Sequence, residues 1–432
     1  MSHSASGIRV VIVGAGPAGM AAAVRAQESG ARVTLIDDNA GAGGQIWRGG
    51  SHSIWFEQLR DAKVEMLTGA QVVSGNLGAH TLLLEHAHRP VEVPFDKLIL
   101  ATGARELFLP FPGWTLPGIF GVGGLQALAK SGWPIRGKRV VVAGTGPLLL
   151  AVAVYLRRHG AKVTLLAEQA DRSAVMNFAF GLLRRREKLT QAAGLQLALT
   201  GIRKRYGCWV ESAQGDGKLE LLRIRQRGRI RLERCDFAAI AYGLCPNIEL
   251  ASLLGCRVNN HIAAPSIDVD EFQQSSIPDI FCAGECTGIG GVELSLIEGE
   301  IAGYAACGIF DRASALFMQR SEGKGFANAL NATFGLRREL KELPKPETLV
   351  CRCEDVSFAH LQEYPSFQAA KLHTRCGMGA CQGRICGPAA RFLFGWEDAS
   401  FRPPVLPARI GTLLHGATQV TTRATTQESI KE

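Results

Sequence analysis

Five cysteines near the C-terminus carry the clearest chemistry in this sequence. Cys351 and Cys353 form a C-x-C pair, Cys381 and Cys386 form a C-x4-C pair, and Cys376 lies just before the second pair. A 2Fe-2S cluster takes four ligands, which are usually cysteine thiolates. The spacing therefore predicts a 2Fe-2S cluster held by Cys351, Cys353, Cys381 and Cys386. Cys376 is interpreted as a buried neighbour outside this ligand set.

The surroundings of these cysteines fit an anionic cluster better than zinc. Nearby arginines would offset the negative charge of the thiolates, and glycines would expose backbone N–H groups to the sulfurs, which tunes the reduction potential. These residues are Arg352, Arg375, Arg384, Gly377, Gly379 and Gly383. Zinc remains the alternative, although structural zinc sites favour C-x2-4-C pairs.

A glycine-rich turn near the N-terminus predicts a dinucleotide site. Gly14, Gly16 and Gly19 have the spacing G-x-G-x-x-G between an expected strand and an expected helix. The first glycine permits a tight turn, the second lets the backbone approach a pyrophosphate, and the third lets the helix pack on the strand. Asp37 ends the next expected strand, where it would bind an adenosine ribose. The predicted site also includes Pro17, Ala18 and Asp38.

Three further segments indicate that this nucleotide is FAD. Gly43, Gly44 and Gln45 follow the ribose-binding aspartate, where flavoproteins with two dinucleotide domains run a loop past the flavin. Thr102-Gly103 and Gly284-Glu285 resemble the other FAD-binding segments of that class, with Glu285 in place of the usual Asp. A helix expected to open near Glu298 would aim its positive end at the flavin, with an ordinary packing helix as the alternative. Val72 completes the predicted FAD contacts.

A second glycine turn departs from the pattern at its third glycine. Gly144 and Gly146 are present, but Leu149 takes the third position and should push the helix away from the strand. Glu168 ends the paired strand at the ribose-binding position. The fold is therefore expected to be retained, while the ligand stays open between NAD, another adenine nucleotide and an empty site.

No cysteine pair faces the expected flavin. Disulfide reductases with this domain pattern need such a pair, and Gln45–Ser51 contains no cysteine. Cys282 and Cys286 are interpreted as small buried thiols. Electrons are therefore expected to leave the flavin by another route.

Strands and helices alternate along most of the chain, which predicts an α/β protein with two doubly wound dinucleotide-binding domains, the second inserted into the first. The FAD-binding domain is expected over residues 1–120 and 248–310, and the second dinucleotide domain over 121–247. Residues 311–346 are expected to form a helical linker, 347–400 the 2Fe-2S domain and 401–432 a partly disordered tail.

The composition indicates a basic globular protein. Of the 432 residues, 47% are hydrophobic and 20% charged, and the net charge is +9. No aromatic residues interleave with the arginines of Arg223–Arg231, so stacking on nucleic acid is not expected. Twelve cysteines, no visible signal peptide and no apolar run long enough to span a membrane predict a cytoplasmic protein. Peripheral attachment to the inner membrane is the alternative.

These segments resemble the A-type subunit of bacterial opine oxidases and D-hydroxyproline dehydrogenases, and the FAD subunit of hydrogen cyanide synthase. The resemblance rests on Gly43–Trp47, Pro110–Gly118, Gly146–Leu150 and the cysteine module. The module by itself also resembles the bacterioferritin-associated ferredoxin-like domain.

The resemblance implies a glutathione-reductase-like pair of domains that carries electrons for a partner. A separate amino-acid-oxidase-like FAD subunit (beta), with a small third subunit as a further candidate, would oxidise an opine, D-hydroxyproline, a related imino acid or glycine. This chain would pass the electrons through its cluster and FAD to a quinone-type acceptor, and no catalytic residue is identified in it. A stand-alone NAD(P)H-dependent FAD reductase and a scaffold that only stabilises a complex are the alternatives.

Overall fold

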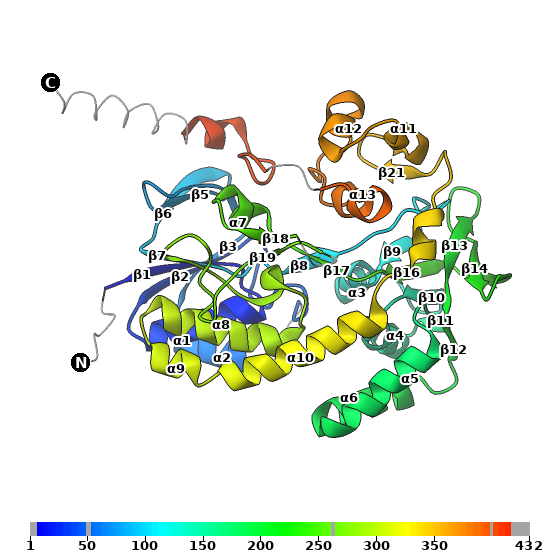
Figure 1. The fold of residues 1–432 in the computed structure, drawn as a ribbon, viewed down its shortest axis with the longest axis horizontal. Helices are drawn as coiled ribbons and strands as arrows, with labels where there is room; N and C mark the ends of the chain where they lie inside the picture. The colour runs from blue at the N-terminus through cyan, green and yellow to red at the C-terminus, as the bar shows by residue number, and fades with distance from the viewer. Residues whose placement is uncertain (1–6, 49–52, 261–263, 398–400, 416–432) are drawn as a thin grey trace. The chain divides into compact units, whose positions relative to one another are not determined.

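The chain folds into two compact units, each built around its own parallel sheet. The computed structural model describes residues 7–48, 53–260, 264–397 and 401–415. Unit 1 takes its described residues from Met1–Arg105, Pro246–Gly325 and Ser400–Glu432, and unit 2 from Glu106–Cys245 and Phe326–Ala399. Strands alternate with helices in both units (Figure 1). The predicted α/β class with two doubly wound domains is confirmed.

The sheet of unit 1 has β1 (Arg9–Val13) at its centre. β2 (Arg32–Asp37) pairs with β1 on one side and β7 (Lys97–Leu100) on the other, both in parallel. The edge strands are β3 (Glu65–Thr68) and β20 (Ile280–Cys282). Because the chain leaves β1 toward β2 and returns on the opposite side as β7, the carboxyl end of β1 is the switch point at which such sheets bind nucleotides.

Two helices cover one face of this sheet. α1 (Pro17–Glu28) begins directly after the first glycine turn, and α8 (Val292–Ala306) packs against it. A Cβ atom at Gly299 would lie 2.1 Å from the carbonyl oxygen of Ala18, and one at Gly303 would lie 2.5 Å from that of Ala22. The two backbones therefore touch, which fixes the N-terminus of α1.

The other face of the unit 1 sheet packs against an antiparallel meander of β4 (Ala70–Asn76), β5 (Thr81–His86) and β6 (Arg89–Pro94). The C-terminal segment lies on this meander. The N–H of Val405 donates to the Val73 carbonyl (2.8 Å), and the N–H of Arg409 and the hydroxyl of Thr412 donate to Glu85 (2.9 and 2.8 Å). Residues 401–415 of the predicted tail are thus packed, while 416–432 lie outside the described residues.

Smaller elements complete unit 1. They are α2 (Ile54–Asp61), β8 (Ala104–Glu106), which runs across the boundary, α7 (Glu249–Leu253), β18 (Val258–Asn259), β19 (Ser266–Ile267), η2 (Gly284–Thr287) and α9 (Phe310–Ser314).

Unit 2 repeats the doubly wound arrangement around β10 (Arg139–Gly144). β11 (Lys162–Glu168) and β16 (Phe237–Ala241) flank β10, and the edge strands are β12 (Arg203–Tyr206) and β9 (Ile119–Gly121). Its helices are α3 (Val122–Lys130), α4 (Leu148–Arg158), α5 (Arg172–Gly181), η1 (Leu182–Arg184) and α6 (Arg186–Ala198). The strand β17 (Leu244–Pro246) runs across the boundary after Cys245.

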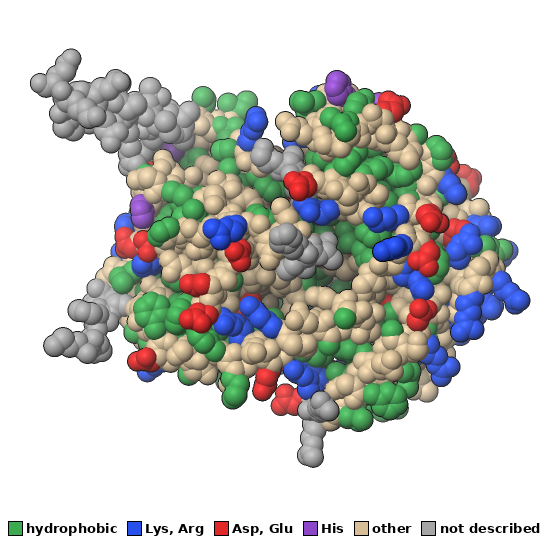
Figure 2. All heavy atoms as spheres, in the orientation of Figure 1, with side chains coloured by type: hydrophobic (Ala, Val, Ile, Leu, Met, Phe, Trp, Pro, Cys, Tyr) green, Lys and Arg blue, Asp and Glu red, His purple; other side chains and the backbone are tan. Residues whose placement is uncertain are grey.

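An antiparallel sheet of unit 2 carries the arginine-rich stretch. β13 (Cys208–Gln214) pairs with β14 (Leu221–Gln226), which forms a hairpin with β15 (Arg229–Arg234). Figure 2 shows Lys and Arg side chains gathered at this hairpin. Glu211 forms ion pairs with Arg223 and Arg225, so part of the positive charge is neutralised locally.

The cysteine-rich module forms a small domain within unit 2. It contains β21 (Leu349–Cys351), β22 (Val356–Ser357), α11 (Phe358–Gln362), α12 (Phe367–Thr374) and α13 (Cys386–Phe394). Its core includes Val350, Leu361, Phe367, Ala370 and Ala390. The indole N–H of Trp114 donates to the Leu349 carbonyl (2.7 Å), which ties the module to the rest of unit 2.

The two units group the chain more coarsely than the predicted domains do. Unit boundaries follow Arg105, Cys245 and Gly325, and α10 (Phe317–Phe334) runs across the last of these. With η3 (Arg338–Glu342), α10 makes the expected linker region largely helical. The predicted boundaries of the FAD-binding, second dinucleotide and 2Fe-2S domains stay predictions.

Candidate functional site

The first glycine turn leaves no room for side chains at two positions. Gly14 has a φ of +104°, and a Cβ atom there would lie 2.2 Å from the carbonyl oxygen of Ala101. A Cβ atom at Gly19 would lie 1.7 Å from the carbonyl oxygen of Gly14. Gly16 is the N-cap of α1, and Pro17 is its first residue. The free N–H groups of this helix end therefore face the switch point, where an anion such as a pyrophosphate binds favourably.

Asp37 is held at the carboxyl end of β2 by backbone donors. It is 6% exposed, and its carboxylate accepts hydrogen bonds from the N–H groups of Ala15 (2.6 Å) and Asn39 (2.8 Å). Burial and the neighbouring Asp37 raise the pKa of Asp38 above its ordinary value. The predicted ribose-binding carboxylate thus lies directly beside the glycine turn.

The loop after β2 also contacts the glycine turn. The N–H of Gly43 donates to the Ala15 carbonyl (2.8 Å). A Cβ atom at Gly44 would come within 2.9 Å of the Cα of Gly16. Gln45 follows with an exposed side chain. The predicted flavin loop is therefore placed against the predicted pyrophosphate site, whereas Val72 is buried in β4 between the sheet and the meander.

Asn247 holds the segment that contains Thr102 and Gly103. Its N–H donates to the Gly103 carbonyl (2.9 Å), and its side-chain amide donates to the Thr102 carbonyl (2.8 Å). The Thr102 hydroxyl in turn donates to the Asn247 carbonyl (2.6 Å). This reciprocal contact fixes the turn after β7 in unit 1.

Gly284 and Glu285 begin η2 near the N-terminus of α1. A Cβ atom at Gly284 would lie 2.7 Å from the Ala18 Cβ, and the Gly284 N–H donates to Glu298 (3.1 Å). Burial raises the pKa of Glu285, and it raises the pKa of Glu298 to about 7. The expectation that a helix opens near Glu298 is wrong, because α8 already begins at Val292.

In the second glycine turn, the first position still has no room for a side chain, whereas the third position holds a leucine. A Cβ atom at Gly144, where φ is +135°, would lie 1.8 Å from the Ala241 carbonyl oxygen. Leu149 is fully buried in the core of unit 2. α4 starts at Leu148, one motif position later than α1, which starts at its proline. The later start accommodates a large side chain where the first turn requires glycine.

Glu168 occupies the ribose-binding position of the second turn. Its carboxylate accepts hydrogen bonds from the N–H groups of Gly146 (2.8 Å) and Ala170 (2.9 Å). Glu168 is 4% exposed, and burial raises its pKa to about 7. Glu168 therefore stabilises the backbone of the turn.

A segment that follows α10 lies along this edge of unit 2. Gln169, which has no exposed surface, donates to the Gly335 carbonyl (2.9 Å) and accepts from the Arg337 N–H (3.2 Å). The Thr145 hydroxyl donates to the Phe334 carbonyl (3.0 Å). The side of the second turn nearest the ribose-binding position is thus partly covered by the chain itself.

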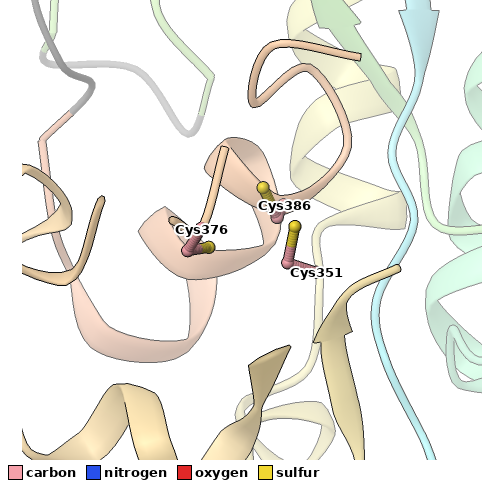
Figure 3. A group of neighbouring side chains, drawn as sticks. All are labelled: Cys351, Cys376 and Cys386. Carbon is pink, nitrogen blue, oxygen red and sulfur yellow. The ribbon is translucent and has the colours of Figure 1, made fainter. Parts of the chain in front are cut away.

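Five cysteines of the C-terminal module come together in the fold. The sulfurs of Cys351, Cys376 and Cys386 lie within 4.8 Å of one another and are buried. Figure 3 shows them converging from the end of β21, the segment after α12 and the start of α13. The sulfurs of Cys353 and Cys381 lie 3.7 Å apart in a more exposed position. A hydrogen bond between Cys381 and Cys386 links the two groups.

Glycines shape the loop around these thiols. A Cβ atom at Gly379 would lie 2.2 Å from the Cβ of Cys353, so only glycine fits there. Arg375, in the left-handed conformation at the end of α12, turns the chain so that Cys376 enters the core of the module.

Backbone N–H groups point at the sulfurs. Cys351 receives those of Gly377 and Glu354, Cys381 receives those of Gly383 and Ile385, and Cys353 receives that of Cys381. Hydrogen bonds from Cys376 and Cys386 lower the pKa of the Cys351 thiol, and one from Cys386 lowers the pKa of Cys381. The predicted role of Gly377 and Gly383 as N–H donors agrees with this geometry. The hydrogen bonds with Cys351 raise the pKa of Cys376 and of Cys386, so within this group anionic sulfur is favoured at Cys351 and Cys381.

The arginines around the module have partners of their own. Arg375 forms an ion pair with Glu354 (2.8 Å), and Arg352 lies 5.4 Å from the centre of the Trp114 ring. The guanidinium of Arg384 donates to the side chain of Gln382 (3.0 Å). These contacts are with Glu354, Trp114 and Gln382, so the predicted compensation of thiolate charge by the arginines stays a prediction.

All twelve cysteines of the chain are free thiols. Cys282 and Cys286 are fully buried, as predicted, and burial raises the pKa of Cys286 to about 12. A buried thiol with a raised pKa is a poor nucleophile and electron carrier. The geometry gathers the four predicted cluster ligands together with Cys376, and the choice of four among the five stays a prediction.

The sequence of residues 8–303 matches the family model described as pyridine nucleotide-disulphide oxidoreductase. The chain belongs to this family. It is 32% identical to the HcnB subunit of hydrogen cyanide synthase from Pseudomonas protegens, over 87% of this chain and 89% of that protein. It is 29% identical to the A-type subunit of opine oxidase from Rhizobium meliloti, over 93% of this chain and 97% of that protein. The predicted resemblance to these subunits is confirmed.

A solved structure shares the fold over most of the chain. The crystal structure of L-proline dehydrogenase from P. horikoshii superposes with a TM-score of 0.71 and 19% identity, over 94% of this chain and 79% of that one. Thioredoxin reductase from Lactococcus lactis matches 71% of this chain with a TM-score of 0.53. The family and these folds make the chain an oxidoreductase with an FAD-binding fold, and its cysteine cluster is consistent with an iron-sulfur cluster.

Gln169, which shapes the second turn, was missed by the sequence reasoning. It acts through a hydrogen bond to a segment far away in the chain, so no local motif marks it. The contact of Cys376 with Cys351 also depends on the fold, although its place in the cysteine-rich loop was a signal.

Proposed function

We propose that this chain is the FAD- and cluster-carrying electron-transfer component of a hetero-oligomeric amine or imino-acid dehydrogenase. The observation that carries the proposal is the gathering of cysteine sulfurs under backbone N–H donors in a chain that also has an FAD-type glycine turn. The relatives support it, because they are subunits of an opine oxidase and of hydrogen cyanide synthase.

The FAD would bind at the switch point of unit 1. Gly14, Gly16, Gly19 and the start of α1 would hold its pyrophosphate, and Asp37 its adenosine ribose. Gly44, Thr102 and Glu285 would line the flavin side, as the sequence predicts. When bound, FAD supplies the ability to accept two electrons and release them singly. The chain's own residues bind and orient it.

The residues of the cysteine module fit a 2Fe-2S cluster. Two sulfurs on one tetrahedral metal ion lie about 3.8 Å apart when each metal–sulfur bond is about 2.3 Å, and the Cys353 and Cys381 sulfurs are 3.7 Å apart. We propose that this pair holds one iron and that Cys351 and Cys386 hold the other. The cluster supplies one-electron transfer. Zinc would instead require four thiols around a single ion.

A partner would supply the substrate site. We propose an amino-acid-oxidase-like FAD subunit that oxidises an opine, D-hydroxyproline or a related imino acid, with glycine as the alternative substrate and a small third subunit as a further component. Electrons would pass through this chain to a quinone-type acceptor. We place the complex in the cytoplasm or at the inner membrane surface, because twelve free thiols fit a reducing compartment. The described residues include no helix suited to spanning a bilayer.

Co-expression with the candidate partner subunits tests this function. The purified complex is expected to reduce a dye with an opine, D-hydroxyproline, proline or glycine, and to contain FAD and iron. Rapid bleaching of the flavin by NADH in this chain alone would instead support a stand-alone reductase. Dye reduction without any change in the flavin spectrum of this chain would support a scaffold.

A further inference from the structure

The segment η2 lies against the start of α1 with a backbone conformation that favours glycine. Gly284 has a φ of +78°, and a Cβ atom there would lie 2.7 Å from that of Ala18, the second residue of α1. The residue before it is tied to the sheet, because the Ala283 N–H donates to the Leu100 carbonyl (3.0 Å). Any movement of η2 therefore alters the space at the helix end where the FAD pyrophosphate would bind.

Glu298 holds this segment from the second turn of α8. One atom of its carboxyl group, Oε2, accepts hydrogen bonds from the Gly284 N–H (3.1 Å) and from the Thr287 hydroxyl (3.1 Å). Gly284 and Thr287 are the first and last residues of η2. Glu298 is only 2% exposed, so bulk water does not take over as acceptor. Both ends of η2 are thus held by one buried oxygen atom.

The acceptor role of Glu298 is available in both of its protonation states. Burial raises the pKa of Glu298 to about 7, while the positive charges of Lys324 and Arg320, both on α10, act in the opposite direction. A carboxylate accepts hydrogen bonds at both oxygens, and a protonated carboxyl group keeps one oxygen free to accept them. A neutral acceptor oxygen is therefore sufficient to hold η2.

We propose that Glu298 is a positioning residue for the flavin, which fixes η2 through its acceptor oxygen so that the backbone of Gly284 and Glu285 keeps the shape that FAD binding requires. This inference rests on the proposed function. Loss of the acceptor leaves two donors without a partner in the interior, which is costly. The segment relieves this cost by moving, and the FAD site changes shape with it.

The test is the affinity of the full chain for FAD, measured by flavin fluorescence after the bound flavin has been removed. Glu298→Ala deletes the acceptor and is expected to raise the dissociation constant about tenfold, since two hydrogen bonds from buried donors are lost. Glu298→Gln keeps an acceptor oxygen without a charge and is expected to stay within about twofold of the wild type.

A second variant tests the same contact from η2. Thr287→Val removes one donor at nearly constant side-chain size and is expected to raise the dissociation constant about threefold. In the Glu298→Ala background it is expected to have no further effect, because the two side chains act through one hydrogen bond. Thr287→Val also decides the matter if circular dichroism shows that Glu298→Ala does not fold.

Glu300→Gln is the matched control, because Glu300 lies on the same helix but forms an ion pair with Arg25 (2.7 Å). It is expected to keep the wild-type affinity. Wild-type affinity in Glu298→Ala or in Thr287→Val overturns the inference, and so does a Glu298→Gln variant as weak as Glu298→Ala, which would assign the effect to charge. These results leave the proposed function intact. A wild-type chain that does not bind FAD overturns both, and its own titration distinguishes that case.

Discussion

The two glycine turns of this chain share one pattern but are built differently. In unit 1, Gly14 and Gly19 both sit where a Cβ atom would overlap a carbonyl oxygen, and α1 starts immediately at Pro17. In unit 2, Gly144 keeps that constraint, while Leu149 fills the third position as a core residue. The doubly wound fold therefore depends on the first glycine, and close approach of the helix depends on the third.

The edges of the two turns differ as well. The Asp37 carboxylate in unit 1 holds the N–H of Ala15, the residue after the first glycine. In unit 2, the Glu168 carboxylate accepts a hydrogen bond from the N–H of Gly146. The side-chain amide of the next residue, Gln169, donates to the Gly335 carbonyl. In unit 1, α1 begins directly after the glycine turn, as binding of a pyrophosphate at its N-terminus requires. In unit 2, the corresponding region forms hydrogen bonds with the segment around Gly335 of the same chain.

The largest effect is expected from a side chain at the third glycine of unit 1. Gly19→Ala places a methyl group on the Gly14 carbonyl oxygen, so α1 must move away from the pyrophosphate site. We expect flavin content to fall more than tenfold, measured by absorbance after gel filtration. Gly41→Ala is the control, because a Cβ atom there meets nothing within 4 Å. Full flavin content in Gly19→Ala would remove the distinction between the turns.

The opposite substitution tests the second turn. Leu149→Ala removes a fully buried side chain from the core around α4 and is expected to destabilise unit 2 by about 2–5 kcal/mol. Chemical denaturation measures the loss, and flavin content is expected to stay at the wild-type level. Leu148→Ala, at a side chain that is 38% exposed, serves as the control with a smaller loss. A Leu149→Ala variant as stable as the wild type would contradict a packing role.

A smaller effect should appear in the pH dependence of stability. Burial raises the pKa of Glu168 to about 7, so its protonated form is favoured in the folded state. Its contribution is complete below about pH 4.5 and is lost as the pH rises through 7, by at most roughly 3 kcal/mol. Denaturation between pH 5 and 8 is expected to show a weaker decline for Glu168→Gln. Glu187→Gln, at an exposed residue of α6, should keep the wild-type slope; an equal slope in all three proteins argues against a buried, protonatable Glu168.

The sequence predicts the fold well where local spacing decides the structure. The glycine turns and the carboxylates that end β2 and β11 follow from patterns a few residues long. The start of α8 was misplaced because the polar residues of Val292–Ala306 do not gather on one face and no side-chain cap marks its first turn. The hydrogen bond between Gln169 and Gly335 and the gathering of the five thiols depend on contacts between distant segments, which no local pattern encodes.

The most direct test of the central claim is the metal and EPR analysis of the complex with and without a predicted ligand. The wild-type complex is expected to contain FAD and about two iron ions per copy of this chain, and to give an EPR signal at low temperature after reduction. Cys381→Ser is expected to abolish that signal while flavin content is retained. An unchanged signal in Cys381→Ser, or zinc in place of iron in the wild type, would contradict the account.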